Sequence, residues 1–231
     1  MALLRQEVLG QIWVQERSLW FGGVKLRSRS TVVKMQNGSL WLHSPAEPTA
    51  ELCRELDALG DVAWILVPNR FHHLHAASLK AKYPRAQIIA PASVRARNSA
   101  VIIDHDIGNA GRDGGLSEFR PLALSGVPFL DETLFFHEPS QSLIAADLMM
   151  CGDPKDHWTW RWVSHAFGQY GKFKLPPDVR MHTKPSPELR ASLDALLKLP
   201  MARILVAHSD TIHDRPAEQL GLAWDFAMRG T

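Results

Sequence analysis

Three apolar runs of this sequence each lead to a side chain that can ligate a metal ion. The runs cover residues 62–67, 143–146 and 204–207, and they are followed by His72, Asp147 and His208. Because α/β proteins place their sites at the ends of covered strands, we predict that these three side chains gather around one divalent metal ion. Imidazole and carboxylate groups suit Zn²⁺, Fe²⁺ and Mn²⁺. Such an ion lowers the pKa of a bound water and polarises a carbonyl or phosphoryl oxygen.

Two further histidines stand beside the first candidate ligand. The stretch from residue 69 to residue 75 reads Asn-Arg-Phe-His-His-Leu-His. We expect a helix over residues 72–82, in which His72 and His75 share a face and His73 points elsewhere. His73 and His75 are therefore the candidates for a fourth ligand or for a catalytic group that shuttles protons.

The apolar patterning predicts an α/β protein. Asn37-Gly38 is the pair most typical of a hairpin turn, and the continuous apolar runs are typical of strands covered on both faces. Leucines at helical spacing between Pro or Ser starts and Gly or Pro stops predict helices. The predicted strands are residues 12–14, 31–35, 40–42, 62–67, 87–90, 133–136, 142–146 and 203–207, and the predicted helices begin near Pro48, His72, Pro187 and Pro216. This order predicts mixed sheets covered by helices, within a single domain over residues 1–231.

The composition excludes several classes of partner. The 231 residues carry 26 Lys plus Arg against 24 Asp plus Glu, a net charge of +2, which is too balanced to predict a nucleic-acid or anionic-membrane partner. No apolar run is long enough to span a bilayer, and we see no secretory signal. Cys53 and Cys151 lack the spacing of a CxxC motif and favour a reducing compartment. We expect a cytoplasmic protein that acts on a small-molecule substrate.

Residues 151–184 mix Trp, Gly and Pro and do not predict a clear element. The three tryptophans Trp158, Trp160 and Trp162 would line a substrate pocket or form a protein-binding patch, but core packing is the prediction for at least two of them. Cys151 lies four residues after Asp147 and is a further candidate nucleophile or ligand. We predict instead that it is a buried and inert thiol.

The order of elements resembles the metallo-β-lactamase superfamily, and in particular a branch known mainly as a domain of unknown function. The residues that carry the resemblance are Leu40–Pro45, Val62–His73 and Asp131–Leu148, and it extends over residues 10–225. The resemblance implies a four-layer αββα sandwich of two mixed β-sheets flanked by helices. It also implies that His72, Asp147 and His208 match three ligands of the family's second metal position. Members often dimerise, but the sequence has no distinct interface segment, so a homodimer is one alternative and the oligomeric state stays open.

The sequence departs from the family's signature, which reads His-x-His-x-Asp-His. When His72 is placed on its last His, Asn69 falls on a His position and Phe71 on the Asp position. The family's mid-domain His ligand belongs near residues 124–128, where this sequence has none. The expectation is therefore one metal ion or none, and both alternatives stay open.

Three functions follow from these residues. The first is a metal-dependent hydrolase of an ester, lactone or thioester with a mononuclear site. The second is a non-haem iron oxidoreductase, because two His and one carboxylate are also the ligands of iron(II) oxygenases. The third is a non-catalytic binding protein that has lost the metal site, with the Trp-rich segment as its binding surface. No motif specifies the substrate.

Overall fold

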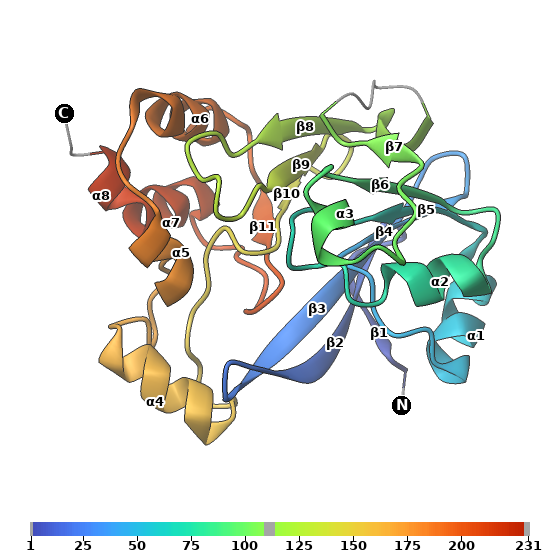
Figure 1. Ribbon diagram of the computed structural model, residues 1–231, viewed down its shortest axis with the longest axis horizontal. Coiled ribbons are helices and arrows are strands. Elements are labelled where there is room, and N and C mark those ends of the chain that lie inside the picture. Colours follow the sequence, from blue (N-terminus) through green and yellow to red (C-terminus); the bar gives the residue numbers. More distant parts are fainter. Residues whose placement is uncertain (1, 109–113, 229–231) are drawn as a thin grey trace. The chain divides into compact units, whose positions relative to one another are not determined.

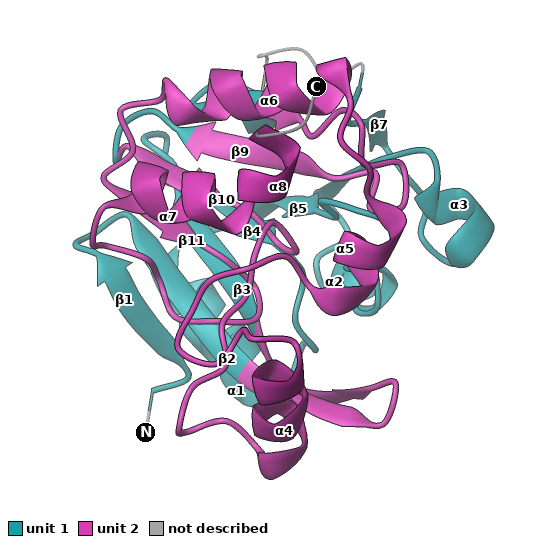
Figure 2. Cartoon of the chain, turned by 90° about the vertical axis from the view of Figure 1, so that its left-hand side faces the viewer, with its two compact units in different colours: residues 1–16, 29–121, 137–140 teal, residues 17–28, 122–136, 141–231 magenta. Residues whose placement is uncertain are grey.

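The computed structural model describes residues 2–108 and 114–228, in which two β-sheets are accompanied by helices (Figure 1). The chain divides into two compact units, which Figure 2 shows in teal and magenta. Unit 1 comprises residues 1–16, 29–121 and 137–140, and unit 2 comprises residues 17–28, 122–136 and 141–231. The single domain expected from the sequence stays a prediction.

The larger sheet has seven strands in the order β1-β2-β3-β4-β5-β6-β7. β3 pairs antiparallel with β4, whereas β4, β5, β6 and β7 pair parallel in turn, so the sheet is mixed. The Asn37-Gly38 turn joins β3 to β4 as predicted, and Gly38 has φ +84°, a conformation that glycine adopts without strain. The strands are β1 (Leu4–Val8), β2 (Ile12–Phe21), β3 (Val24–Lys34), β4 (Leu40–His43), β5 (Val62–Leu66), β6 (Gln87–Ala90) and β7 (His105–Asp106).

Unit 1 contains the helices α1 (Ala50–Leu59), α2 (Ala76–Lys82) and α3 (Val94–Arg97), with a 3₁₀ turn at Gly114–Leu116. The hydroxyl of Thr49 accepts the N–H of Leu52 and so begins α1. α2 packs on β5 and β6. Apolar side chains from these helices and strands share one buried core, which includes Leu52, Leu56, Ile65, Leu79 and Ile88.

The helix expected from His72 begins four residues later, at Ala76. The side chain of Asn69 accepts the backbone N–H groups of Phe71 and His72, and residues 71–75 form turns instead of the first turn of the helix. Asn side chains compete with helical hydrogen bonding in this way. The prediction that His72 and His75 share a helix face was therefore wrong.

The smaller sheet has the strand order β11-β10-β9-β8, and β10 pairs parallel with β11. Its strands are β8 (Phe119–Ala123), β9 (Thr133–His137), β10 (Ser142–Ile144) and β11 (Arg203–Leu205). Two mixed sheets with helices confirm the predicted α/β fold class.

Unit 2 holds five helices among its described residues. They are α4 (Trp158–Ala166), α5 (Pro177–His182), α6 (Pro187–Leu197), α7 (Pro216–Ala223) and α8 (Asp225–Met228). α6, α7 and α8 pack on one another, as Figure 1 shows. The hydroxyl of Ser186 accepts the N–H of Leu189 and begins α6 where Ser186-Pro187 predicted a start. No helix in the described ranges is long and apolar enough to cross a membrane.

The tryptophans of α4 contradict the packing expected of them. Trp160 is 3% exposed, but Trp158 is 68% exposed and Trp162 is 71% exposed. Residues four apart lie on the same helix face, so Trp158 and Trp162 face outward together while Trp160 packs inward. The prediction that at least two of the three pack in the core was wrong.

One buried ion pair in unit 1 gives a test of this fold. Glu7 accepts a hydrogen bond from the buried Arg29 at 3.1 Å and pairs with the exposed Arg5 at 2.7 Å. We expect Glu7→Gln to lower the free energy of unfolding by about 3 kcal/mol, because it leaves the Arg29 charge buried without its carboxylate. Chemical denaturation measures this loss. Arg5→Ala, which removes only the exposed partner, is the control and leaves stability nearly unchanged.

Candidate metal centre

Asp147 and His208 follow the two parallel strands β10 and β11. The pairing continues beyond the strands, because Ala145 donates to Leu205 and Ala207 donates to the carbonyl of Ala146. The chain segments that follow β10 and β11 therefore leave the sheet at the same edge. There Asp147 Oδ1 lies 3.2 Å from His208 Nε2, and both side chains are about one-tenth exposed, at 11% and 10%. The structure thus places two of the predicted ligands in direct contact within unit 2.

Glu132 holds the backbone from which Asp147 projects. It lies just before β9 and is buried. Its carboxylate accepts the N–H of Ala146 at 2.7 Å and that of Asp147 at 3.1 Å. Charge-assisted hydrogen bonds of this kind are about twice as strong as neutral ones, so Glu132 fixes the position of Asp147.

The orientation of His208 is set by a backbone carbonyl. His208 Nδ1 donates to the carbonyl oxygen of Arg27 at 2.7 Å, which directs Nε2 toward Asp147. Burial lowers the pKa of His208, but the hydrogen bond to Asp147 and the charges of Asp147 and Glu132 outweigh it, so the pKa lies above its usual value. An imidazole beside two carboxylates is well placed to share a cation or a proton with them.

Arg27 is held in turn by two acids of unit 2. Its guanidinium binds Asp156 at 2.5 Å and Asp210 at 2.9 Å. Because the Arg27 carbonyl is the acceptor for His208, these ion pairs stabilise the backbone that orients the imidazole. Asp210 also binds Lys155 at 2.6 Å, and these partners lower its pKa against the opposing effect of burial.

His72 is positioned within unit 1 by two hydrogen bonds. Its Nδ1 shares a hydrogen bond with the hydroxyl of Ser44, and its backbone N–H donates to Asn69. Ser44 follows β4, and the hydroxyl of Ser30 donates to the Ser44 carbonyl. Asn69, which occupies a His position of the family signature, therefore serves here to shape the turn that carries His72.

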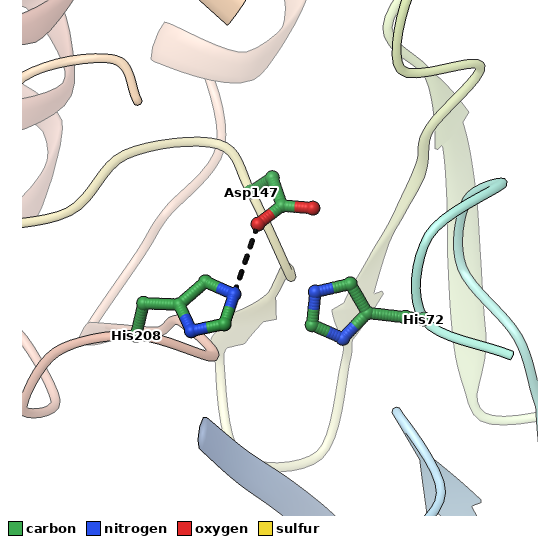
Figure 3. A group of neighbouring side chains, drawn as sticks. All are labelled: His72, Asp147 and His208. Carbon is green, nitrogen blue, oxygen red and sulfur yellow. Dashed lines mark ion pairs between the residues drawn. The ribbon is translucent and has the colours of Figure 1, made fainter. Parts of the chain in front are cut away.

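Figure 3 draws the Asp147–His208 pair together with His72. One nitrogen or carboxylate oxygen from each of the three residues lies within 4.8 Å of the others. Over residues 2–108 and 114–228 this is the one group of three His, Cys, Asp or Glu side chains with such spacing. The His-Asp-His cluster is compatible with a metal site, and its members are the three residues predicted from the ends of the apolar runs together with the family resemblance.

His73 and His75 are not members of that group. His73 Nδ1 lies 3.2 Å from the side-chain nitrogen of Asn98, and burial together with the nearby charges of Arg97 and His72 lowers the pKa of His73. His75 occupies the residue before α2, where its side chain makes no capping hydrogen bond. The catalytic or ligand role predicted for either residue stays a prediction.

Two other positions bear on the predicted chemistry. The ring of Phe71, which stands on the Asp position of the signature, lies under the guanidinium of Arg97 at 5.1 Å, a cation–π contact. Cys151 is half-buried, and burial raises the pKa of its thiol to about 11. A thiol with so high a pKa is a poor nucleophile at neutral pH, in line with the predicted inertness, but the prediction that Cys151 is buried was only partly right.

The supporting residues Ser44, Asn69, Glu132 and Arg27 were missed in the sequence. Three of them, Ser44, Glu132 and Arg27, reach a candidate ligand from another part of the chain, so no local spacing marks them. Asn69 lies only three residues before His72, but in the sequence it stood out only as a departure from the family signature. Glu132 alone carried a signal, because an acid stands directly before the apolar run of β9. A buried carboxylate needs several hydrogen-bond donors, and the backbone after β10 supplies them.

A model for a domain of unknown function (DUF4336) matches residues 9–94. No curated protein sequence matches the chain significantly. The metallo-β-lactamase from Pontibacter korlensis is 11% identical with a TM-score of 0.67, covering 98% of this chain and 100% of that chain. The DIM-1 metallo-β-lactamase exposed to ceftazidime is 13% identical with a TM-score of 0.67 and 97% coverage of each chain. The metallo-β-lactamase from Hirschia baltica is 7% identical with a TM-score of 0.64, covering 95% and 96%.

At these identities the likeness concerns the fold, and the chain has the metallo-β-lactamase fold. The resemblance predicted from the sequence is confirmed at this level, and the matching domain of unknown function agrees with the uncharacterised branch.

The hydrogen bonds of Glu132 provide a test of the centre. We expect Glu132→Gln to lower the free energy of unfolding by about 2 kcal/mol. The glutamine amide has a single, uncharged oxygen, whereas the carboxylate has two charged oxygens that accept the N–H groups of Ala146 and Asp147. Denaturation in the presence of a chelator measures the effect on the protein alone. Glu218→Gln, which changes an exposed acid beside Arg215, is the matched control. Equal stability of the two variants would contradict the role of Glu132.

Proposed function

We propose that this protein is a metal-dependent hydrolase of a small-molecule ester, lactone or thioester, with one divalent ion held by His72, Asp147 and His208. The observation that carries the proposal is the spacing of these three side chains, whose ligand atoms lie within 4.8 Å of one another. Chains with this fold include the metallo-β-lactamases that match almost end to end. That likeness supports the class of chemistry, and it leaves the substrate open.

The side chains fit such an ion in their chemistry. A carbonyl oxygen only accepts hydrogen bonds, so His208 carries its proton on Nδ1 where it meets the Arg27 carbonyl, and its Nε2 is the ligating nitrogen. His72 likewise uses Nδ1 in a hydrogen bond, with Ser44. Metal-ligating imidazoles usually donate their second nitrogen to a carbonyl, carboxylate or other polar partner. Two such imidazoles and one carboxylate suit Zn²⁺, Fe²⁺ and Mn²⁺.

Several residues of the chain would position the candidate ligands or transfer protons during hydrolysis. A bound divalent ion would supply an acidified water and polarise the carbonyl of the substrate. Glu132 keeps Asp147 in place, and Arg27 keeps the imidazole of His208 directed at it. His73 is the candidate for proton transfer or for a fourth ligand, because it directly follows His72 in the chain. His75 is the alternative for the same role.

The metal content of purified protein tests the ligand set. We expect protein prepared without chelator to contain about one equivalent of zinc, iron or manganese by elemental analysis. His72→Ala, Asp147→Ala and His208→Ala should each reduce this content at least tenfold, since each removes one of three protein ligands. His165→Ala, which changes an exposed histidine stacked on Tyr170, should retain the full content and controls for surface binding.

Circular dichroism of every variant separates loss of metal from loss of fold. Metal retained in all three folded ligand variants would overturn the ligand set. Wild-type protein that contains no metal, and binds none when zinc, iron(II) or manganese(II) is added, would overturn the hydrolase proposal. That result would favour a non-catalytic binding protein.

A second function is favoured by the same donor set. Two histidines and one carboxylate also bind iron in non-haem iron(II) oxygenases. For this alternative we expect protein purified without oxygen to contain iron in preference to zinc, and to consume oxygen when a substrate is present. His208→Ala should abolish both properties. Zinc as the bound metal, with no oxygen consumption, would exclude the oxidoreductase.

A further inference from the structure

Five large aromatic side chains are exposed together in unit 2. They come from the end of β2 and from α4 with the residue that follows it, and we call them the aromatic surface: Trp20, Phe21, Trp158, Trp162 and Phe167. Each is more than half exposed, from 52% for Phe167 to 71% for Trp162. Scattered exposed apolar residues are normal, but a contiguous group of large aromatics marks an interaction site.

Two contacts join the β-hairpin to α4. Trp20 packs edge-on against the ring of His157 at 5.6 Å, and the backbone N–H of Lys25 donates to the hydroxyl of Thr159 at 3.0 Å. Figure 1 shows α4 beside the end of the β2–β3 hairpin, and residues 17–28 and α4 belong to the same unit. These contacts place Trp20 at the start of α4, where Trp158 is also exposed.

The outward face of α4 mixes aromatic and cationic side chains. Trp158 and Trp162 are four residues apart, as are Arg161 and His165, and all four side chains are exposed. Trp160 and Ser164 form the buried face. The helix thus turns its largest apolar side chains toward solvent, which reverses the usual arrangement of a helix packed on a core.

The two segments that carry the aromatic surface contain charged residues of one sign only. Residues 17–28 and 157–174 contain no Asp or Glu, and their cations are Arg17, Lys25, Arg27, Arg161, Lys172 and Lys174. Arg27 is neutralised by Asp156 and Asp210. The exposed Arg161, Lys172 and Lys174 give this surface a local positive charge that the whole-chain balance of +2 does not reveal.

We propose that the aromatic surface docks on a lipid bilayer that contains anionic phospholipid. Tryptophan is the residue most enriched where a protein meets the interface of a membrane, and neighbouring Lys and Arg add attraction to anionic headgroups. A protein partner fits less well, because Lys is depleted from protein–protein interfaces whereas two lysines flank these rings. The expectation of no membrane partner rested on net charge, which averages over both units.

Vesicle co-sedimentation of the full chain tests the proposal. We expect binding to vesicles of phosphatidylcholine with phosphatidylglycerol, and much weaker binding to phosphatidylcholine alone. Trp158→Ala with Trp162→Ala should lower the partition coefficient about tenfold or more, because both rings lose their burial in the interface. Arg161→Gln, Lys172→Gln and Lys174→Gln together should lower it about 100-fold. Raising the salt to about 1 M should weaken wild-type binding, since it screens exposed charges.

Matched variants make the result specific. Met181→Ala with Leu222→Ala removes two exposed apolar side chains elsewhere in unit 2 and should leave vesicle binding unchanged. The substituted tryptophans are exposed, so circular dichroism should report an intact fold. Wild-type protein that does not sediment with anionic vesicles, or tryptophan variants that sediment equally well, would overturn the proposal. It is also overturned if these variants instead abolish a dimer, which would assign the aromatic surface to a second copy of the chain.

Discussion

The parallel pairing of β10 with β11 is the constraint on which the candidate metal centre depends. Parallel strands in register leave a sheet at the same edge, and here the pairing extends to Ala146 and Ala207. The next residues are Asp147 and His208, which meet at 3.2 Å. Sixty residues separate Asp147 from His208 in the sequence. Their contact therefore results from the pairing of β10 with β11 and not from a local sequence motif.

Buried polar partners turn this contact into a fixed site. An unsatisfied buried donor or acceptor costs about 1–3 kcal/mol, and each of the three candidate ligands has a polar partner. Glu132 accepts the N–H of Asp147, and the Arg27 carbonyl accepts from His208. Within unit 1, the hydroxyl of Ser44 shares a hydrogen bond with His72 Nδ1. These bonds orient the two imidazoles, and metal-binding imidazoles are usually oriented by such a bond to their second nitrogen.

The candidate ligands could be predicted from the sequence, whereas most of the residues that hydrogen-bond them could not. Asp147 and His208 were found because an apolar run before a polar residue is a local signal of a covered strand and its end. Glu132 and Arg27 act across the fold, so their roles depend on pairings that no short segment reveals. The fold class, the β3–β4 hairpin and α6 were predicted because turn and capping residues act on their immediate neighbours.

Two local predictions were wrong: the start of the helix at His72 and the burial of at least two of the three tryptophans of α4. Asn69 binds the N–H groups of Phe71 and His72 and delays α2 to Ala76. Helical spacing showed that Trp158 and Trp162 share a face, but spacing alone does not say whether that face is buried. The structure exposes this face, since Trp158 is 68% and Trp162 is 71% exposed.

Native mass spectrometry of the wild-type protein, stripped of metal and titrated with zinc, tests the central claim most directly because it counts the ions bound to each chain. The account predicts that one ion binds and that binding stops there, since Asn69 and Phe71 stand at two positions where the family signature has metal-binding residues. A chain that binds no ion, or that takes up two ions with similar affinity, would contradict a mononuclear centre of His72, Asp147 and His208.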